Sequence, residues 1–131
     1  MIHTEVSSLP FRKIYAIDFE YCGPDGEIPK IVCMVIEDLR SGEVSRYWCD
    51  DICEMRTPPF ETGEDVALLG YYAPAEVQSM RDLILSEGPW SKAQRSAILD
   101  YCQQDVVALG PLLNAMLRHA PWSELQFNQA L

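Results

Sequence analysis

The chain has little positive charge. It contains 10 lysines and arginines against 20 aspartates and glutamates, which gives a formal net charge of −10 at pH 7. A protein that binds nucleic acid by neutralising many phosphates has the opposite balance, so broad electrostatic binding of DNA or RNA is disfavoured. The composition still allows an enzyme whose metal ions reverse the charge locally, and it allows an acidic interaction module without catalysis.

Long hydrophobic runs are missing as well. No stretch reaches the roughly 18 consecutive apolar residues that indicate a membrane-spanning helix, so no membrane association is expected. The first ten residues have neither the basic nor the apolar segment of a signal peptide, and we expect a cytoplasmic protein.

Histidines and paired cysteines are also scarce. The two histidines, His3 and His119, lie toward the ends of the sequence and give no support to a histidine-based nucleophile relay. Among the five cysteines only Cys49 and Cys53 are close, and no second pair with zinc spacing follows. Free thiols in a reducing compartment are therefore expected.

What the chain does contain fits one α/β domain. Its 131 residues are 48% apolar, which is enough for a core. Residues 1–12 and 121–131 are expected to be peripheral tails. Apolar runs separated by tight turns predict three strands in an antiparallel meander, because the connections are too short for a parallel crossover. The predicted strands are residues 13–21, 31–39 and 44–48.

The middle of the chain has two parts. Residues 50–65 are polar and interrupted by prolines, which predicts a loop, with room for one helical turn. The short apolar run at residues 66–72 favours a fourth strand, and the alternative is the start of a helix.

The rest of the chain is predicted to be helical. Apolar residues at helical spacing predict one helix over residues 75–86 and a longer one over 92–109. Ser91 and Gln94 form a capping-box pattern at the start of the longer helix. Gly110-Pro111 predicts a kink or a break, after which residues 112–117 continue as helix.

Two acidic residues interrupt the first predicted strand. Asp18 and Glu20 are two positions apart, so their side chains project from the same face. Two like charges held together resist ionisation unless a cation lies between them, and oxygen ligands of this kind suit Mg²⁺ or Mn²⁺. The alternative is an edge strand whose polar face carries two acids, and the spacing alone does not separate the two interpretations.

A second pair of polar residues lies in the long predicted helix. Tyr101 and Asp105 are four positions apart and share one helical face. A carboxylate on an apolar helix face costs free energy unless it is paired or bound to metal, and a neighbouring tyrosine hydroxyl can orient a water molecule. The alternative is an amphipathic helix with Tyr101 at its boundary and Asp105 in solvent.

Together the two pairs resemble the first and third motifs of the DEDDy 3′–5′ exonucleases, which include the proofreading domains of family A DNA polymerases and the RNase D-like enzymes. The similarity touches most of residues 13–118 and is nearest to a DNA polymerase I-like subgroup. It implies a ribonuclease H-like α/β fold in which a three-strand antiparallel meander is extended by a further strand and packed with helices. The segments that carry the resemblance are Ala16-Ile17-Asp18-Phe19-Glu20-Tyr21, Gly88-Pro89-Trp90-Ser91 and Ile98-Leu99-Asp100-Tyr101-Cys102-Gln103-Gln104-Asp105-Val106.

The middle motif of that family is matched less well. Glu76 would stand at the position of its aspartate, with Tyr72 in place of an asparagine and Ala75 in place of an aromatic residue. Glu76 also lies at the start of the next predicted helix, so it is either a metal ligand or part of that helix. The interval between Asp18 and Asp105 is shorter than in the family, which predicts an internally truncated domain.

The resemblance implies a metal-dependent 3′–5′ exonuclease that hydrolyses phosphodiester bonds at the 3′ end of single-stranded DNA, as in proofreading during replication. Two Mg²⁺ or Mn²⁺ ions would be held by Asp18, Glu20, Glu76 and Asp105. Tyr101 would position the attacking water and share the catalytic role with Asp18, Glu20 and Asp105.

Substrate and partners follow from the same resemblance. Phe19, Tyr21 and Tyr72 are candidates for stacking on terminal bases, and filling the core is the alternative role, above all for Phe19. A polymerase or another replication protein is an expected partner. Loss of covering helices would expose apolar surface, which suggests a homodimer. The competing interpretation of the whole chain is an inactive remnant of this fold that serves as an acidic nucleic-acid- or protein-interaction module.

Overall fold

The computed structural model describes residues 6–23, 28–70, 78–86 and 88–119. Its centre is a four-stranded mixed sheet in the order β3-β2-β1-β4. The first three strands are antiparallel neighbours, and β4 runs parallel to β1. This arrangement confirms the predicted meander and the predicted fourth strand. The strands are β1 (Lys13–Cys22), β2 (Lys30–Asp38), β3 (Val44–Trp48) and β4 (Val66–Leu69).

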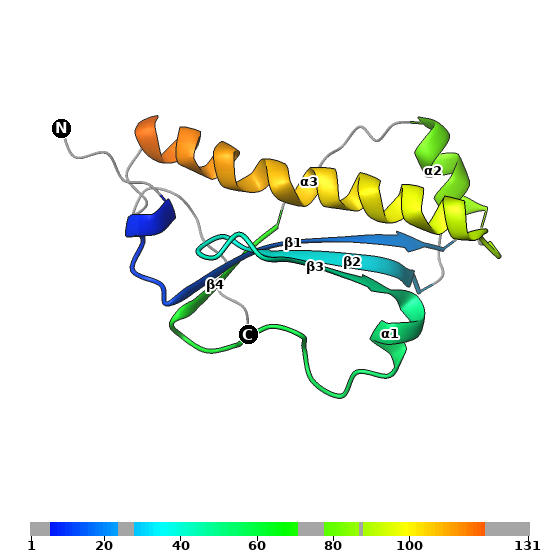
Figure 1. Ribbon diagram of the computed structural model, residues 1–131, viewed down its shortest axis with the longest axis horizontal. Helices are drawn as coiled ribbons and strands as arrows, with labels where there is room; N and C mark the ends of the chain where they lie inside the picture. The colour runs from blue at the N-terminus through cyan, green and yellow to red at the C-terminus, as the bar shows by residue number, and fades with distance from the viewer. Residues whose placement is uncertain (1–5, 24–27, 71–77, 87, 120–131) are drawn as a thin grey trace.

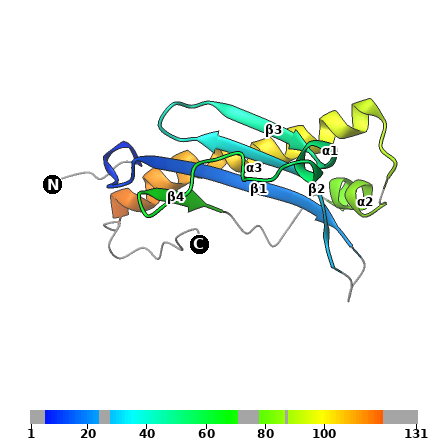
Figure 2. The ribbon, with the colours of Figure 1, turned by 90° about the horizontal axis from the view of Figure 1, so that it is seen from below.

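Helices lie on both faces of the sheet, but one face is covered along its length and the other only in part. The long helix α3 crosses one face along its length, while α1 and the loop after it lie against the other face (Figures 1 and 2). Helix α2 packs on the α3 side, beside β1 and α3. Across the described ranges, no helix combines the length and the apolar character needed to cross a membrane. The helices are η1 (Val6–Ser8), α1 (Cys49–Cys53), α2 (Gln78–Leu85) and α3 (Lys92–His119).

Strand β1 lies in the middle of the sheet and is buried on both faces. Because side chains alternate along a strand, Ile14 and Ala16 face α3, whereas Tyr15 and Ile17 face the opposite side. The α3 side of the sheet packs against Ile98 and its neighbours in the main core. The opposite side packs against Ile52 of α1 and Phe60 of the loop after it. Burial on both faces explains why β1 reads as a nearly continuous apolar run.

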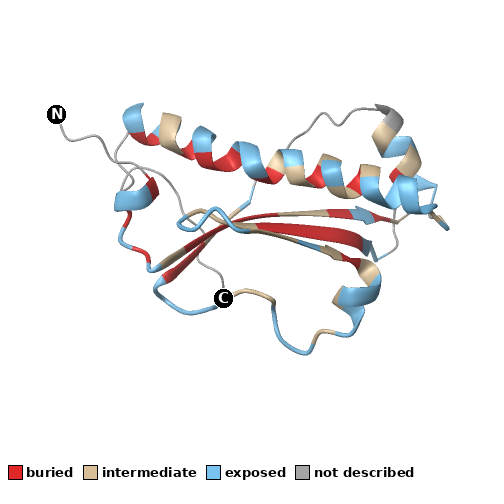
Figure 3. Cartoon of the chain, viewed as in Figure 1, coloured by how far each residue is buried: buried red, intermediate tan, exposed pale blue. Residues whose placement is uncertain are grey.

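Helix α3 is held to the sheet by one buried stripe, which Figure 3 shows as a red band facing the strands. The predicted capping box is present at its start. The main-chain N–H of Gln94 donates to Ser91 Oγ at 3.1 Å, and the main-chain N–H of Ser91 donates to Gln94 Oε1 at 2.8 Å. The spacing of the stripe matches a helix that buries one face. Its residues are Ile98, Cys102, Val106, Leu109, Gly110, Leu113 and Leu117.

The helix continues unbroken through Pro111 to His119, so the predicted alternative of a break is wrong. A proline inside a helix removes one backbone donor and costs about 3 kcal/mol. Burial of Leu109, Leu113 and Leu117 on both sides of it offsets that cost. Gly110 lets the helix come close to β2, because a Cβ there would lie only 3.3 Å from a methyl carbon of Leu39.

The expectation of a loose segment over residues 1–12 is wrong for the part that the structure describes. Val6, Leu9 and Phe11 are buried against Leu113 and Leu117 of α3. The backbone there is also tied down, since the N–H of Val6 donates to Asn114 Oδ1 at 2.8 Å. The apolar residues of this segment do not recur with a helical or strand period, so the sequence alone did not predict that they would be buried.

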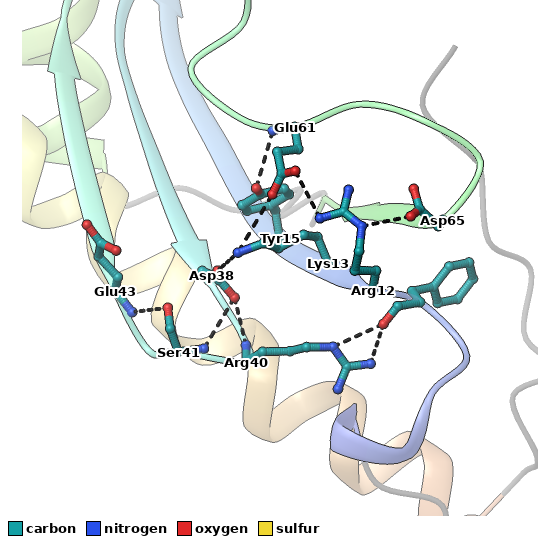
Figure 4. A network of polar contacts seen from close by, with 10 residues as sticks. Arg12, Lys13, Tyr15, Asp38, Arg40, Ser41, Glu43, Glu61 and Asp65 are labelled. Atoms are coloured by element: carbon teal, nitrogen blue, oxygen red, sulfur yellow. Dashed lines mark hydrogen bonds and ion pairs between the residues drawn. The ribbon is translucent and has the colours of Figure 1, made fainter.

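Arg40, just after β2, clamps the same segment. Its guanidinium donates to the carbonyl oxygens of Ser7 and Leu9 at 2.8 Å each and to that of Phe11. At this end of the sheet Lys13 Nζ also pairs with a carboxylate oxygen of Asp38 at 3.0 Å (Figure 4). Hydrogen bonds to charged donors contribute about 1.5–3 kcal/mol each at most, so Arg40 is a major support of the N-terminal segment.

We expect Val106→Ala to lower the free energy of unfolding by about 2–3 kcal/mol, because it removes two methyl groups from a fully buried site. Val107→Ala is the matched control, because Val107 is 39% exposed. Truncating its side chain should change the free energy of unfolding by less than about 0.5 kcal/mol. Urea denaturation of both variants measures the difference. Equal effects would contradict the placement of α3 on the sheet.

Candidate metal centre

The second half of β1 brings two carboxylates to the face that α3 covers. Asp18 pairs across the sheet with Val35, and Glu20 pairs with Cys33. Both acids therefore lie on the same face as Ala16, as their spacing predicted. Glu20 is only 4% exposed, whereas Asp18 is half-buried and lies nearer to solvent. A buried carboxylate of this kind needs polar or ionic partners.

Helix α3 contributes a thiol to the same place. The Cys102 thiol donates a hydrogen bond to the main-chain carbonyl oxygen of Asp18 at 3.4 Å. One ligand atom each from Asp18, Glu20 and Cys102 lie within 4.8 Å of one another. A strand and a helix far apart in the sequence thus supply three donor atoms to one small volume.

Asp105 lies one helical turn further along α3 and reaches the same strand. Its carboxyl group lies near that of Asp18 and interacts with it. Burial raises the pKa of Asp105 above its ordinary value of 3.8, and the contact with Asp18 opposes this shift in part. The predicted partners Asp18 and Asp105 are therefore adjacent, although Asp105 is outside the three-atom group formed by Asp18, Glu20 and Cys102.

Tyr101 precedes Cys102 on the same helix and is half-buried. Tyr101 lies about one helical turn before Asp105, so the two side chains share one face of α3. Burial of the adjacent Cys102 orients this part of α3 toward β1. The tyrosine ring therefore lies at the border between the core and solvent, where a hydroxyl can meet a substrate or water.

A second thiol lies beside the first. Cys33 and Cys102 are both 0% exposed, and they lie in the same core cluster, where their side chains interact. This contact, burial and the nearby charges of Asp18 and Glu20 raise the pKa of the Cys102 thiol far above its ordinary value. All five cysteines are free thiols, as the sequence predicted.

The three aromatic candidates for base stacking fall in different places. Phe19 faces the other side of the sheet, where it packs partly buried against the core of Met34 and Ile36, and this favours its structural role. Tyr21 is 58% exposed near the end of β1, and the alternation along the strand turns it toward the same side as Phe19, away from Asp18 and Glu20. Tyr72 and the predicted ligand Glu76 lie outside the described residues.

The donor atoms fit a divalent cation, but they do not all suit the same kind. The carboxylate oxygens of Asp18 and Glu20 suit Mg²⁺ or Mn²⁺, and Asp105 is close enough to Asp18 to extend such a site. The sulfur of Cys102 is a soft ligand, which hard cations avoid. The acids therefore fit the expected Mg²⁺ or Mn²⁺, whereas the thiol does not.

Sequence reasoning missed the two thiols because it searched for local cysteine spacing. Cys33 lies in an apolar run of β2, and Cys102 lies in the buried stripe of α3, so each reads as a core residue. The only local signal was that Cys102 stands between Tyr101 and Asp105. Their contact arises only when α3 is placed across β1 and β2.

Asp105→Asn is expected to stabilise the metal-free protein at neutral pH. Because folding raises the pKa of Asp105, ionising this carboxyl group costs more free energy in the folded protein than in the unfolded chain. This destabilisation is absent below pH 3.8 and grows as the pH rises above that value. Asparagine keeps the shape of the side chain and can still donate to Asp18. Melting temperatures in the presence of a chelator should show the gain at neutral pH and its loss at acidic pH.

Asp100→Asn on the same helix is the control for this measurement. The Asp100 carboxylate is 59% exposed and accepts a hydrogen bond from Arg46 Nη1 at 2.7 Å. Removing an exposed ion pair costs about 0–1 kcal/mol, so this variant should be unchanged or slightly less stable. A similar gain in both variants would contradict the burial of Asp105.

Comparisons with known proteins identified no relative of this chain. No protein-family model, no curated protein and no solved structure matches the chain. The functional assignment therefore rests on the residues of the candidate metal centre and on the motifs that they form.

Proposed function

We propose that the protein is a metal-dependent 3′–5′ exonuclease that acts on the 3′ end of single-stranded DNA. The observation that carries this proposal is the meeting of Asp105 from α3 with Asp18 from β1, beside Glu20 on the same strand face. These residues correspond to the acids of the first and third motifs of the exonucleases that the sequence resembles, and they come from distant parts of the chain. An adventitious pair of motifs has no reason to converge in space.

The fold is proposed to be a shortened ribonuclease H-like domain. Supporting it are the antiparallel meander of β1, β2 and β3, the fourth strand parallel to β1, and a helix that lies across β1 and β2. In this arrangement the central strand holds the first two acids, and the helix supplies the third.

The chemistry is hydrolysis of a terminal phosphodiester bond. Asp18, Glu20 and Asp105 would hold divalent cations, which supply the positive charge that the attacking and leaving oxygens need. Tyr101 orients the attacking water through its hydroxyl group. Burial of Glu20 and Cys102 excludes bulk water from the inner side of the site, which strengthens every electrostatic interaction there.

The charge of the protein fits a substrate that is held mainly at one end. A net charge of −10 disfavours contact along a long stretch of phosphates, so the bound ions would supply most of the attraction. Such a protein is expected to favour frayed or single-stranded ends over duplex DNA.

An acidic interaction module without catalysis is the second candidate. It is favoured by the overall charge and by the thiol that lies among the carboxylates, which is foreign to a pure oxygen site. The two candidates differ in their response to Mg²⁺, since only the enzyme requires the ion.

Asp18→Ala is expected to abolish Mg²⁺-dependent release of nucleotides from 3′-labelled single-stranded DNA. Tyr101→Phe should reduce the rate on the order of 10²-fold, because the positioned hydroxyl is lost while the metal ligands remain. Tyr47→Phe, whose ring packs on the opposite face of the sheet, should leave the rate unchanged. Activity that survives Asp18→Ala would identify a contaminating nuclease and refute the proposal.

Mg²⁺ or Mn²⁺ should also raise the melting temperature. An ion that binds only the folded state at 100 times its dissociation constant stabilises that state by about 2.7 kcal/mol. The increase should disappear in Asp18→Ala and persist in Asp100→Ala, whose carboxylate is 59% exposed and pairs with Arg46. The inactive-module interpretation predicts no increase in any of the three proteins.

A further inference from the structure

The two buried thiols give the candidate metal centre a ligand set that a magnesium-dependent enzyme does not need. Cys102 contributes a sulfur within 4.8 Å of carboxylate oxygens of Asp18 and Glu20. Cys33, the cross-strand partner of Glu20, contacts Cys102 from β2. Three donor atoms, from Asp18, Glu20 and Cys102, therefore lie close together at the interface of α3 and the sheet, and the sulfur of Cys33 lies in the same core cluster but outside that group.

This combination is typical of ligands for thiophilic cations. Zn²⁺ and Cd²⁺ accept thiolate and carboxylate ligands together, and Zn²⁺ prefers four ligands in a tetrahedron. With Zn–S bonds near 2.3 Å and Zn–O bonds near 2.0 Å, neighbouring ligand atoms lie about 3.5 Å apart. The ligand atoms of Asp18, Glu20 and Cys102, which lie within 4.8 Å of one another, would move slightly closer together to reach this spacing.

We infer that Asp18, Glu20 and Cys102, with Cys33 as the fourth donor, form a binding site for a thiophilic divalent cation of the zinc and cadmium class. The half-buried carboxylate of Asp18 is the point of entry, since the other three donors are buried. As a metal–sulfur bond forms, the thiol releases its proton to solvent. Two carboxylates and one or two thiolates then neutralise the charge of the ion.

Occupancy by such a cation would prevent the proposed nuclease reaction, and this consequence rests on the proposed function. The same carboxylates of Asp18 and Glu20 serve both kinds of ion, so the two cannot bind together. Thiolate ligands favour the softer ion strongly, whereas Mg²⁺ gains nothing from sulfur. A thiophilic ion would therefore act as an inhibitor that excess Mg²⁺ displaces poorly.

The experiment is a titration with CdCl₂, followed by the ultraviolet charge-transfer absorption that cadmium–thiolate bonds produce. Cys49 and Cys53 of α1 lie one helical turn apart and would bind cadmium themselves, so the parent protein carries Cys49→Ser and Cys53→Ser. The parent should bind one Cd²⁺ per chain, develop the absorption band and release protons into a weakly buffered solution. Zinc should compete for the same site, and a large excess of Mg²⁺ should not.

Cys102→Ser in this parent background should remove the band and weaken binding by more than about 10-fold, the loss that even an outer-shell change causes. Circular dichroism first establishes that the variant is folded. If it is not, Glu20→Gln keeps both thiols and removes one carboxylate, and it should weaken binding by a similar factor. A band that persists with unchanged affinity in the folded variant, or a parent without a band, would overturn the inference.

Nuclease assays on the same proteins separate this inference from the proposed function. A parent that binds cadmium but lacks Mg²⁺-dependent activity would support the cation site and refute the exonuclease. A parent that is active with Mg²⁺ but shows no cadmium band would refute the cation site alone. Inhibition by Zn²⁺ that weakens in Cys33→Ser, whose carboxylate ligands are intact, would support both.

Discussion

The structure depends on the packing of one helix over one central strand. Strand β1 is buried on both faces, and α3 covers the face that carries Asp18 and Glu20. The apolar stripe of α3 provides most of the free energy that holds the two elements together, because each buried aliphatic side chain contributes about 1.5–3 kcal/mol. That packing forces two carboxylates and a thiol into an interface where water is scarce. The candidate metal centre is thus a direct consequence of how the core is closed.

Charged residues have different surroundings at the two ends of β1. At its start, charged residues are satisfied by ion pairs at the surface, as Lys13 is by Asp38 and Arg12 is by Asp65. Such pairs contribute little, but they leave no charge buried. In its second half, the acids lie beneath the helix, and the raised pKa of Asp105 reports the cost of burying charge there. Proteins retain unfavourable groups of this kind at functional sites more often than elsewhere, which is why the acids, and not the ion pairs, are the focus of the proposed function.

The two proposals assign the same site two kinds of metal chemistry that exclude each other. Carboxylate oxygens suit the hard cations that phosphodiester hydrolysis uses, whereas the sulfurs of Cys33 and Cys102 suit soft ones. Both sulfurs belong to the main core and pack against apolar neighbours, so they are also adequately explained as small hydrophobic residues when no ion is bound. The softness of the donors, together with their distance from the carboxylates, decides which ions are able to compete. Under the two proposals, the buried sulfur of Cys102 would therefore decide the selectivity of the site.

Local signals in the sequence were sufficient for most elements and for the alternation that puts Asp18 and Glu20 on one face. Period-two alternation, tight turns and the Ser91–Gln94 capping box act between residues near in sequence, so they are readable without a fold. Three features required the tertiary structure. Helix α3 passes through Pro111 because burial on both sides outweighs the lost hydrogen bond, and residues 6–11 are ordered because Arg40 and α3 hold them. The meeting of Asp105 with Asp18 and of Cys102 with Cys33 depends on the angle and position at which α3 crosses the sheet, which distant packing contacts determine and no local pattern encodes.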